Sequence, residues 1–218
     1  MLEILNLTNY FRQLHLKLTP PKVLSELYEL AYGIHFVFEK HNLTYFLDSG
    51  SAVGAIRHKG IIPWDDDLDL VITEEQESLF LTTIRAELLK DKKVKIVNGG
   101  SNDIWDYKLV SIYNEQKMFP ACDVFVVKHA EARNAYVFRN AYLTSLWPYE
   151  FNESVMHPIL TNFGSSQMRI LPIDAYHWFT NWYGKSWRNV GMTARYDHTH
   201  DQHLIPMTFQ IPNNMMLF

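Results

Sequence analysis

The sequence is poor in cysteine and has no long hydrophobic run. Its 218 residues include one cysteine, Cys122, which excludes a disulfide framework and suits a reducing compartment. No stretch approaches the roughly 18 apolar residues that a membrane-spanning helix needs. The first residues, Glu3 among them, lack the basic-then-apolar pattern of a signal peptide. We therefore expect a soluble, cytoplasmic protein; a Golgi location would require a targeting element outside these residues.

A surplus of positive charge is also missing. The formal net charge is -4, from 20 lysines and arginines against 24 aspartates and glutamates. A broad electrostatic grip on a nucleic-acid backbone needs the opposite sign, so nucleic acid is not an expected partner. Because 47% of the residues are hydrophobic, the chain can bury one substantial core. We expect a single domain over 1–218, with its core at about 20–190 and a peripheral tail at 191–218.

Hydrophobic periodicity predicts a mixture of helices and strands. Apolar residues recur at helical spacing from Val23 to Phe38, and Thr19 followed by two prolines is typical of a helix start. Thr73 and Gln76 match a capping box, which predicts that Thr73 caps the next helix. Residues 128–170 give weak signals. The expected elements are a helix at 20–41, a strand at 43–47, a helix at 52–58, a strand at 66–72, a helix from 74, strands at 94–97, 107–113 and 122–127, and a helix from 172 to about 184.

The strand expected at 66–72 carries an unusual set of acidic residues. Successive side chains on a strand point to opposite faces, so Asp67 and Asp69 share one face, with Asp65 if the strand reaches it. Packing explains the apolar residues on the other face, but it does not explain the acids. Two carboxylates about 7 Å apart repel each other unless a cation lies between them. Hard oxygen ligands suit Mg²⁺ or Mn²⁺, and a two-metal site can assist phosphoryl transfer.

This acidic segment has two other interpretations. A solvated acidic turn is the common explanation of a charge cluster, and composition alone does not exclude it. A calcium loop would use Asp65, Asp67 and Asp69 as D-x-D-x-D, but Leu70 stands where glycine is needed. Gln76 also stands where the bidentate glutamate belongs, so the calcium loop is rejected.

A glycine turn precedes the acidic strand. Gly50 and Ser51 follow an apolar strand and open a helix, and backbone N–H groups at such a position bind phosphate. Arg57 and Lys59 lie one to two turns further on and could neutralise the same phosphates. A glycine-serine turn alone is weak evidence. Its short distance from the D-x-D strand predicts a cleft that holds both an anion and metal ions.

Two later residues could complete such a site. Asp123 begins an otherwise apolar run, where burying an unpaired charge would be costly, and is the best candidate for a third carboxylate. The alternative is a water-exposed residue at the start of a strand. Lys108 lies in another expected strand and could reach a phosphate, although a surface lysine is about as well supported.

Three segments together resemble the LicD family of phosphotransferases, which includes fukutin and the fukutin-related protein. They are FLDSGS at 46–51, GAIRH at 54–58 and IPWDDDLD at 62–69, and the match over these thirty or so residues is specific. Two weaker echoes of the family pattern follow, at CDVF in 122–125 and at the proline-to-tryptophan ending in 172–187.

The resemblance implies an α+β, nucleotidyltransferase-like fold of the polymerase-β type: a small mixed sheet with helices packed on one face. It implies Mg²⁺-dependent transfer of a phospho-alcohol, such as phosphocholine or ribitol phosphate, from a CDP-linked donor to a hydroxyl of a glycan or lipid-linked glycan. Position by position, it implies metal binding by Asp67, Asp69 and Asp123, binding of the donor phosphates by Gly50, Ser51 and Arg57, and a supporting or general-base role for Asp65. Template-independent nucleotidyl transfer and a non-catalytic binding domain of the same fold remain open.

Two further groups of residues are candidates for binding. The tryptophans could cage a quaternary ammonium by cation–π contact, although core packing explains most of them more simply. The histidines and aspartates at 197–203 could bind zinc, but no cysteine or helical i, i+4 pair supports that interpretation. The tryptophans concerned are Trp64, Trp105, Trp178, Trp182 and Trp187.

Overall fold

A mixed β-sheet forms the centre of the computed structural model, which describes residues 18–100, 103–193, 196–197, 202–203 and 207–211. β2 (Leu68–Thr73) and β5 (Ala121–Ala130) run parallel, whereas the other neighbours in the main path of the sheet are antiparallel. β6 (Ala135–Phe138) pairs with the far half of β5, and β7 (Phe151–Asn152) pairs with β6. Across the sheet the order is β1 (Tyr45–Leu47), β2 (Leu68–Thr73), β5 (Ala121–Ala130), β4 (Tyr107–Ser111) and β3 (Val94–Asn98).

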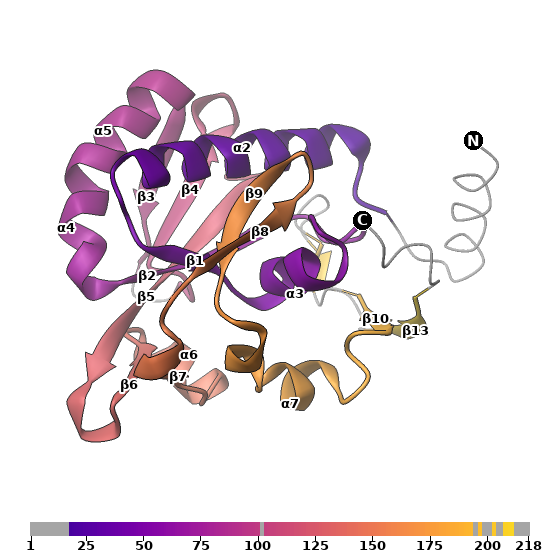
Figure 1. Cartoon of the computed structure of the whole chain (residues 1–218). Coiled ribbons are helices and arrows are strands. Elements are labelled where there is room, and N and C mark those ends of the chain that lie inside the picture. The colour runs from indigo at the N-terminus through magenta and orange to yellow at the C-terminus, as the bar shows by residue number, and fades with distance from the viewer. Residues whose placement is uncertain (1–17, 101–102, 194–195, 198–201, 204–206, 212–218) are drawn as a thin grey trace.

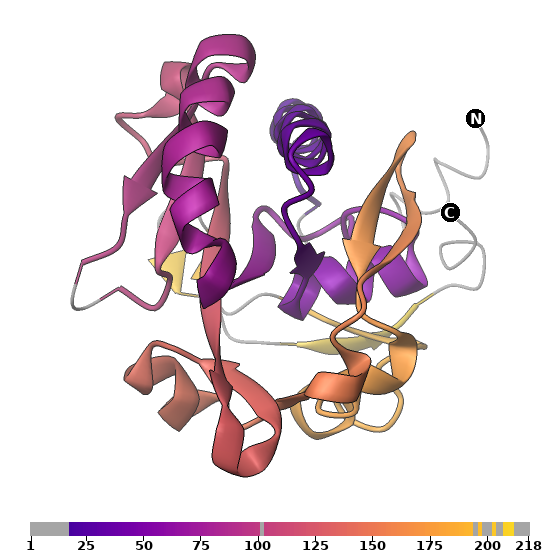
Figure 2. The same cartoon turned by 60° about the vertical axis from the view of Figure 1, so that its left-hand side comes forward.

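Helices cover one face of this sheet. α2 (Pro21–Lys40) lies along it. Figure 2 shows α2 end-on between the helical run at 74–92 and the hairpin of β8 (Ile159–Phe163) and β9 (Ser166–Ile170). Phe38 of α2 and Phe80 of the helical run are both fully buried, with ring centroids 6.0 Å apart. The run contains α4 (Glu77–Leu79) and α5 (Arg85–Glu87), joined and followed by π-helical turns. α3 (Ser49–Arg57) connects β1 to the loop before β2 (Figure 1).

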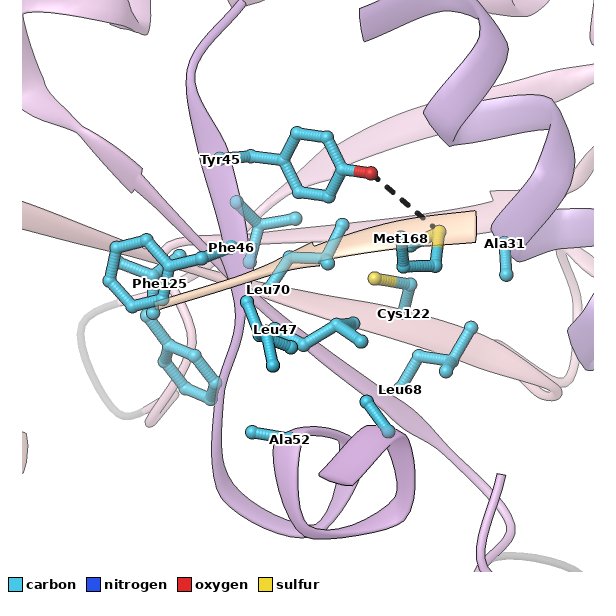
Figure 3. Packing of buried hydrophobic residues seen from close by; sticks show 14 of the residues in the cluster. Ala31, Tyr45, Phe46, Leu47, Ala52, Leu68, Leu70, Cys122, Phe125 and Met168 are labelled. Carbon is cyan, nitrogen blue, oxygen red and sulfur yellow. Dashed lines mark hydrogen bonds between the residues drawn. The ribbon is translucent and has the colours of Figure 1, made fainter. Parts of the chain in front are cut away.

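The apolar half of each central strand faces these helices. The register places Leu70 beside Leu47 on β1 and beside Val124 on β5, so all three project from one face. Figure 3 shows Leu68, Leu70 and Cys122 gathered there, below Tyr45, whose hydroxyl donates to Met168 Sδ at 3.6 Å. Burying each large side chain contributes roughly 1.5–3 kcal/mol. This packing holds the alternate residues of β2 and β5, among them the acidic ones, on the opposite face.

Aromatic side chains cover part of that opposite face. Phe46 packs edge-on against Phe151, with ring centroids 5.2 Å apart, and Tyr149 stacks on Trp178 at 4.3 Å. Trp147, just after α6 (Ala141–Leu146), packs against Phe125 of β5.

Several element boundaries differ from the sequence predictions. The helix expected at 20–41 is confirmed as α2, but α3 begins at Ser49, three residues before its expected start. The capping box is wrong: the Thr73 side chain makes no capping hydrogen bond, and Gln76 Oε1 accepts the Thr44 N–H at 3.2 Å. β5 runs on to Ala130 because β6 pairs with its second half.

The later part of the chain contains strands that periodicity did not reveal. β8 (Ile159–Phe163) and β9 (Ser166–Ile170) form a hairpin beside β1, where Met168 supplies apolar contact with the core. The helix expected from 172 is split into a 3₁₀ turn, Ile173–Tyr176, and α7 (Phe179–Tyr183). In the tail, β10 (Val190–Met192) pairs with β13 (Thr208–Gln210), and β11 (Tyr196–Asp197) pairs with β12 (Gln202–His203).

The lengths and hydrophobicity of the helices bear on membrane spanning. None of the helices among the described residues combines the length and the apolar character that crossing a bilayer requires.

Candidate active site

The parallel pairing of β2 with β5 brings two of the predicted carboxylates together. Asp69 lies directly beside Asp123 in the register of the two strands, which are separated by 4.7–4.9 Å in sheets of this kind. Asp67 precedes Asp69 by two residues, immediately before β2 begins at Leu68. Asp69 and Asp123, which are 54 positions apart in the chain, therefore lie side by side near the beginnings of two central strands.

The electrostatics of Asp69 show how crowded this site is. Burial raises the pKa of Asp69 well above its ordinary value, and the negative charges of Asp67, Asp123 and Asp65 raise it further. Carboxylate oxygens of Asp65, Asp66 and Asp67 also lie within 4.8 Å of one another. Oxygen donors at this density, with one of them buried and repelled by the others, fit a hard divalent cation such as Mg²⁺ or Mn²⁺.

The glycine turn lies next to these acids. Because α3 begins at Ser49, Gly50 and Ser51 belong to its first turn, where N–H groups lack partners within the helix. The Ser51 hydroxyl accepts the backbone N–H of Asp69 at 2.9 Å and so ties the helix start to β2. A methyl group at Gly50 would lie 2.5 Å from Asp65 Oδ2, so the Asp65 carboxylate stands directly over the glycine.

The structure separates the two basic residues that were expected to follow the turn. Arg57 Nη1 donates to the carbonyl oxygens of Trp187 and Val190, at 2.7 and 3.2 Å, and Nε donates to His58 Nε2 at 2.9 Å. Arg57 therefore holds the segment after α7 against α3. Lys59 is exposed and lies just beyond the C-terminal end of α3. At 1.5 Å per residue, that end of the helix lies about 13 Å from the N-terminal end, which is next to the acids. The phosphate-binding roles of both residues stay predictions.

Lys108 is part of the acidic cluster. Its ammonium lies 2.6 Å from Asp123 Oδ1, and the two residues stand opposite each other on β4 and β5. Asp123 is thus a buried acid with a cationic partner, rather than a water-exposed strand end.

The tryptophans do not gather into one cage. Trp64 packs against His58 and Phe209, and Trp187 packs against Phe179. Trp105 lies near Lys108. Trp178 and Trp182 line a common pocket beside the start of α3. The other residues that line it are Ser49 of the FLDSGS segment, Trp147, Tyr149, Phe179 and Tyr183. The side chains at 197–203, considered for zinc, lie outside the described residues.

Sequence reasoning missed a further acid beside this site. Asp48 lies between β1 and α3, is fully buried, and accepts the hydroxyl of Tyr149 at 2.9 Å through Oδ2. Its backbone N–H donates to the Asp69 carbonyl at 3.2 Å, so the Asp48 backbone contacts β2 directly. Asp48 belongs to the FLDSGS segment, but no spacing rule identified its role. Tyr149 lies in the segment that gave weak signals.

Burial raises the pKa of Asp48 from its ordinary value of 3.8 to about 6, and the Tyr149 hydrogen bond opposes the shift. The folded state therefore binds this proton more tightly than the unfolded state does. The associated stability, about 3 kcal/mol at 1.36 kcal/mol per pKa unit, is fully present below pH 3.8 and is lost as the pH rises through about 6.

Asp48→Asn is accordingly expected to stabilise the protein in a pH-dependent way. Asparagine is neutral at every pH and can still accept the Tyr149 hydroxyl. The variant should match the wild type near pH 4 and exceed its free energy of unfolding by about 2–3 kcal/mol at pH 8. Urea unfolding at both pH values measures this, with the exposed Asp91→Asn as control. A difference that does not change with pH would contradict the assignment.

The chain is similar in sequence to known proteins. Residues 42–170, more than half of the chain, match the family described as LicD/FKTN/FKRP, nucleotidyltransferase domain. The lipopolysaccharide cholinephosphotransferase LicD of Haemophilus influenzae is 43% identical over 47 residues, which are 22% of this chain and 18% of that protein. The ribitol 5-phosphate transferase FKRP of Homo sapiens is 30% identical over 138 residues, 63% of this chain and 23% of that protein. The matched segments thus span about a fifth of the length of these relatives.

Solved structures of low identity were also found. The lincosamide antibiotic adenylyltransferase LnuA with bound lincomycin aligns with a TM-score of 0.44 and 14% identity, covering 79% of this chain and 98% of that one. ANT(2")-Ia with adenylyl-2"-tobramycin aligns with a TM-score of 0.42 and 16% identity, covering 71% and 74%. The family match itself confirms the resemblance seen in the sequence and the expected α+β nucleotidyltransferase-type fold. The chain belongs to the LicD/FKTN/FKRP nucleotidyltransferase-domain family.

Proposed function

We propose that this domain transfers a phospho-alcohol, of the phosphocholine or ribitol phosphate type, from a CDP-linked donor to a hydroxyl of a glycan or lipid-linked glycan. The observation that carries the proposal is the meeting of Asp67, Asp69 and Asp123 at one sheet edge, beside the first turn of α3. The family relatives named as a cholinephosphotransferase and a ribitol 5-phosphate transferase support the same class of reaction.

The proposed reaction moves one phosphoryl group. The acceptor hydroxyl oxygen bonds to the phosphorus that carries the alcohol, the bond from that phosphorus to the CMP oxygen breaks, and CMP leaves with the electron pair. The hydroxyl proton passes to a carboxylate. Asp65, which stands over Gly50, is the proposed base, because it lies where the donor phosphates would meet the helix start.

Asp67 and Asp69 would hold the divalent cation, Mg²⁺ or Mn²⁺, which when bound would neutralise charge on the transferring phosphate. Their oxygens fit such an ion because Asp69 is buried among negative neighbours that raise its pKa. The backbone N–H groups of Gly50 and Ser51 are placed to contact phosphate oxygens at the positive end of α3.

A donor screen tests the proposal. The purified chain is incubated with CDP-choline, CDP-ribitol, CDP-glycerol or a UDP-sugar, with Mg²⁺ or with EDTA, and thermal shift is measured. CMP release is then measured in the same mixtures after addition of hydroxyl-bearing glycans as acceptors. We expect Mg²⁺-dependent stabilisation and CMP release with at least one CDP-alcohol and none with UDP-sugars. Pyrophosphate release from CTP or UTP would instead favour nucleotidyl transfer. Binding of a donor without release of any product would favour a non-catalytic domain.

A further inference from the structure

Lys108 occupies a defined place in the acidic site. It stands opposite Asp123 in the antiparallel pair of β4 and β5, and Asp123 stands beside Asp69 in the parallel pair of β5 and β2. Residues that face each other on neighbouring strands project from the same face of the sheet. One ammonium and two carboxylates therefore form a row across three strands. The backbone register of the strands fixes the order of these residues.

The Lys108–Asp123 pair is also largely hidden from water. The side chain of Lys108 is 13% exposed and that of Asp123 is 10% exposed, with 2.6 Å between Nζ and Oδ1. Lys108 Nζ lies 5.0 Å from the centre of the Trp105 ring, which offers the ammonium a second favourable contact. Removing one partner of a buried ion pair is far more costly than removing one partner of an exposed pair.

This arrangement conflicts with a second metal ion on Asp123. The two ions of a two-metal site lie about 3.5–4 Å apart and share carboxylate ligands. An ion that used Asp123 as a ligand would come within a few ångströms of the Lys108 ammonium, and the two cations would repel each other strongly in a site with little water. In the strand register the neighbour of Asp69 on β5 is Asp123, whereas Lys108 stands one strand further away, on β4.

We propose that Lys108 takes the place of a second metal ion. The site then binds one divalent cation, on Asp67 and Asp69, while the Lys108 ammonium neutralises Asp123 and presents a fixed positive charge to the donor phosphates. This inference rests on the proposed function, and it replaces the three-carboxylate, two-metal arrangement expected from the sequence. Asp123 becomes a positioning residue that holds Lys108.

Counting bound Mn²⁺ tests this inference on the full chain, without substrate. Free Mn²⁺ is measured by electron paramagnetic resonance during titration of the wild type and of Lys108→Met, which keeps the length of the side chain but removes its charge. We expect one ion per wild-type chain and two per Lys108→Met chain. Lys95→Met is the matched control, because Lys95 pairs with Glu115 on the exposed side of β3, and it should bind one ion.

The outcomes separate the two proposals. Two ions on the wild type, or an unchanged count and affinity in Lys108→Met, would overturn the role of Lys108 and leave phospho-alcohol transfer standing. No Mn²⁺ binding by the wild type would overturn both, because the metal requirement itself would fail. Circular dichroism of each variant confirms that the counts refer to folded protein.

Discussion

Asp69→Asn is expected to lower metal-dependent transfer at least about a hundredfold. Loss of a partner in the outer shell of a metal site typically costs 10–100-fold, and Asp69 is proposed as a direct ligand. Asparagine keeps the shape of the side chain but supplies a neutral oxygen in place of a carboxylate. CMP release from the active CDP-alcohol at saturating Mg²⁺ measures the effect.

The same substitution should leave the metal-free protein at least as stable as the wild type. Burial and the charges of Asp67 and Asp123 raise the pKa of Asp69, so the ionised form of this side chain is less favourable in the folded chain than in the unfolded chain. The melting temperature in EDTA should therefore stay equal or rise. Asp91→Asn, on the exposed end of the helical run, should change neither quantity. An inactive variant that also melts well below the wild type would argue that Asp69 is structural.

The face on which Asp69 lies could be predicted because it depends on a local rule. Side chains alternate along a strand, so the apolar residues Leu68 and Leu70 of β2 fix one face and leave Asp69 on the other, whereas Asp67 lies just before the strand. Asp123 was predictable for a similar reason, since it interrupts an apolar run. The neighbouring positions of Asp69 and Asp123 were not a local property. They required the parallel pairing of two strands about fifty residues apart.

The hydrogen-bond partners of individual polar side chains could not be predicted from strand alternation or helical periodicity. Asp48 meets Tyr149 across 101 positions, and neither residue belongs to a periodic pattern that would bring them together. The phosphate role expected of Ser51 uses its backbone N–H; the contact of its hydroxyl, which accepts the N–H of Asp69 18 positions away, was not predicted. The sequence therefore predicted residue types at the site more reliably than it predicted their partners.

The hydrogen-bond partners of Arg57 could not be predicted from the sequence either. A basic residue in the last turn of a helix can reach a ligand or a carbonyl oxygen, and the choice depends on what packs there. Here the Trp187 and Val190 carbonyls, some 130 positions away, accept its Nη1. Arg57→Ala should therefore destabilise the protein by about 2–4 kcal/mol, because it leaves buried acceptors without their charged donor.

Chemical denaturation measures this loss, and Arg85→Ala provides a matched control. Arg85 donates to Asn98 Oδ1 at the surface, so its removal should cost less than about 1 kcal/mol. Equal losses for the two variants would contradict a structural role for Arg57. Donor and acceptor affinities of Arg57→Ala, measured where the variant is still folded, then address its phosphate role. Donor binding should weaken more than acceptor binding if the guanidinium also contacts phosphate, whereas equal weakening would assign Arg57 to holding the segment after α7 alone.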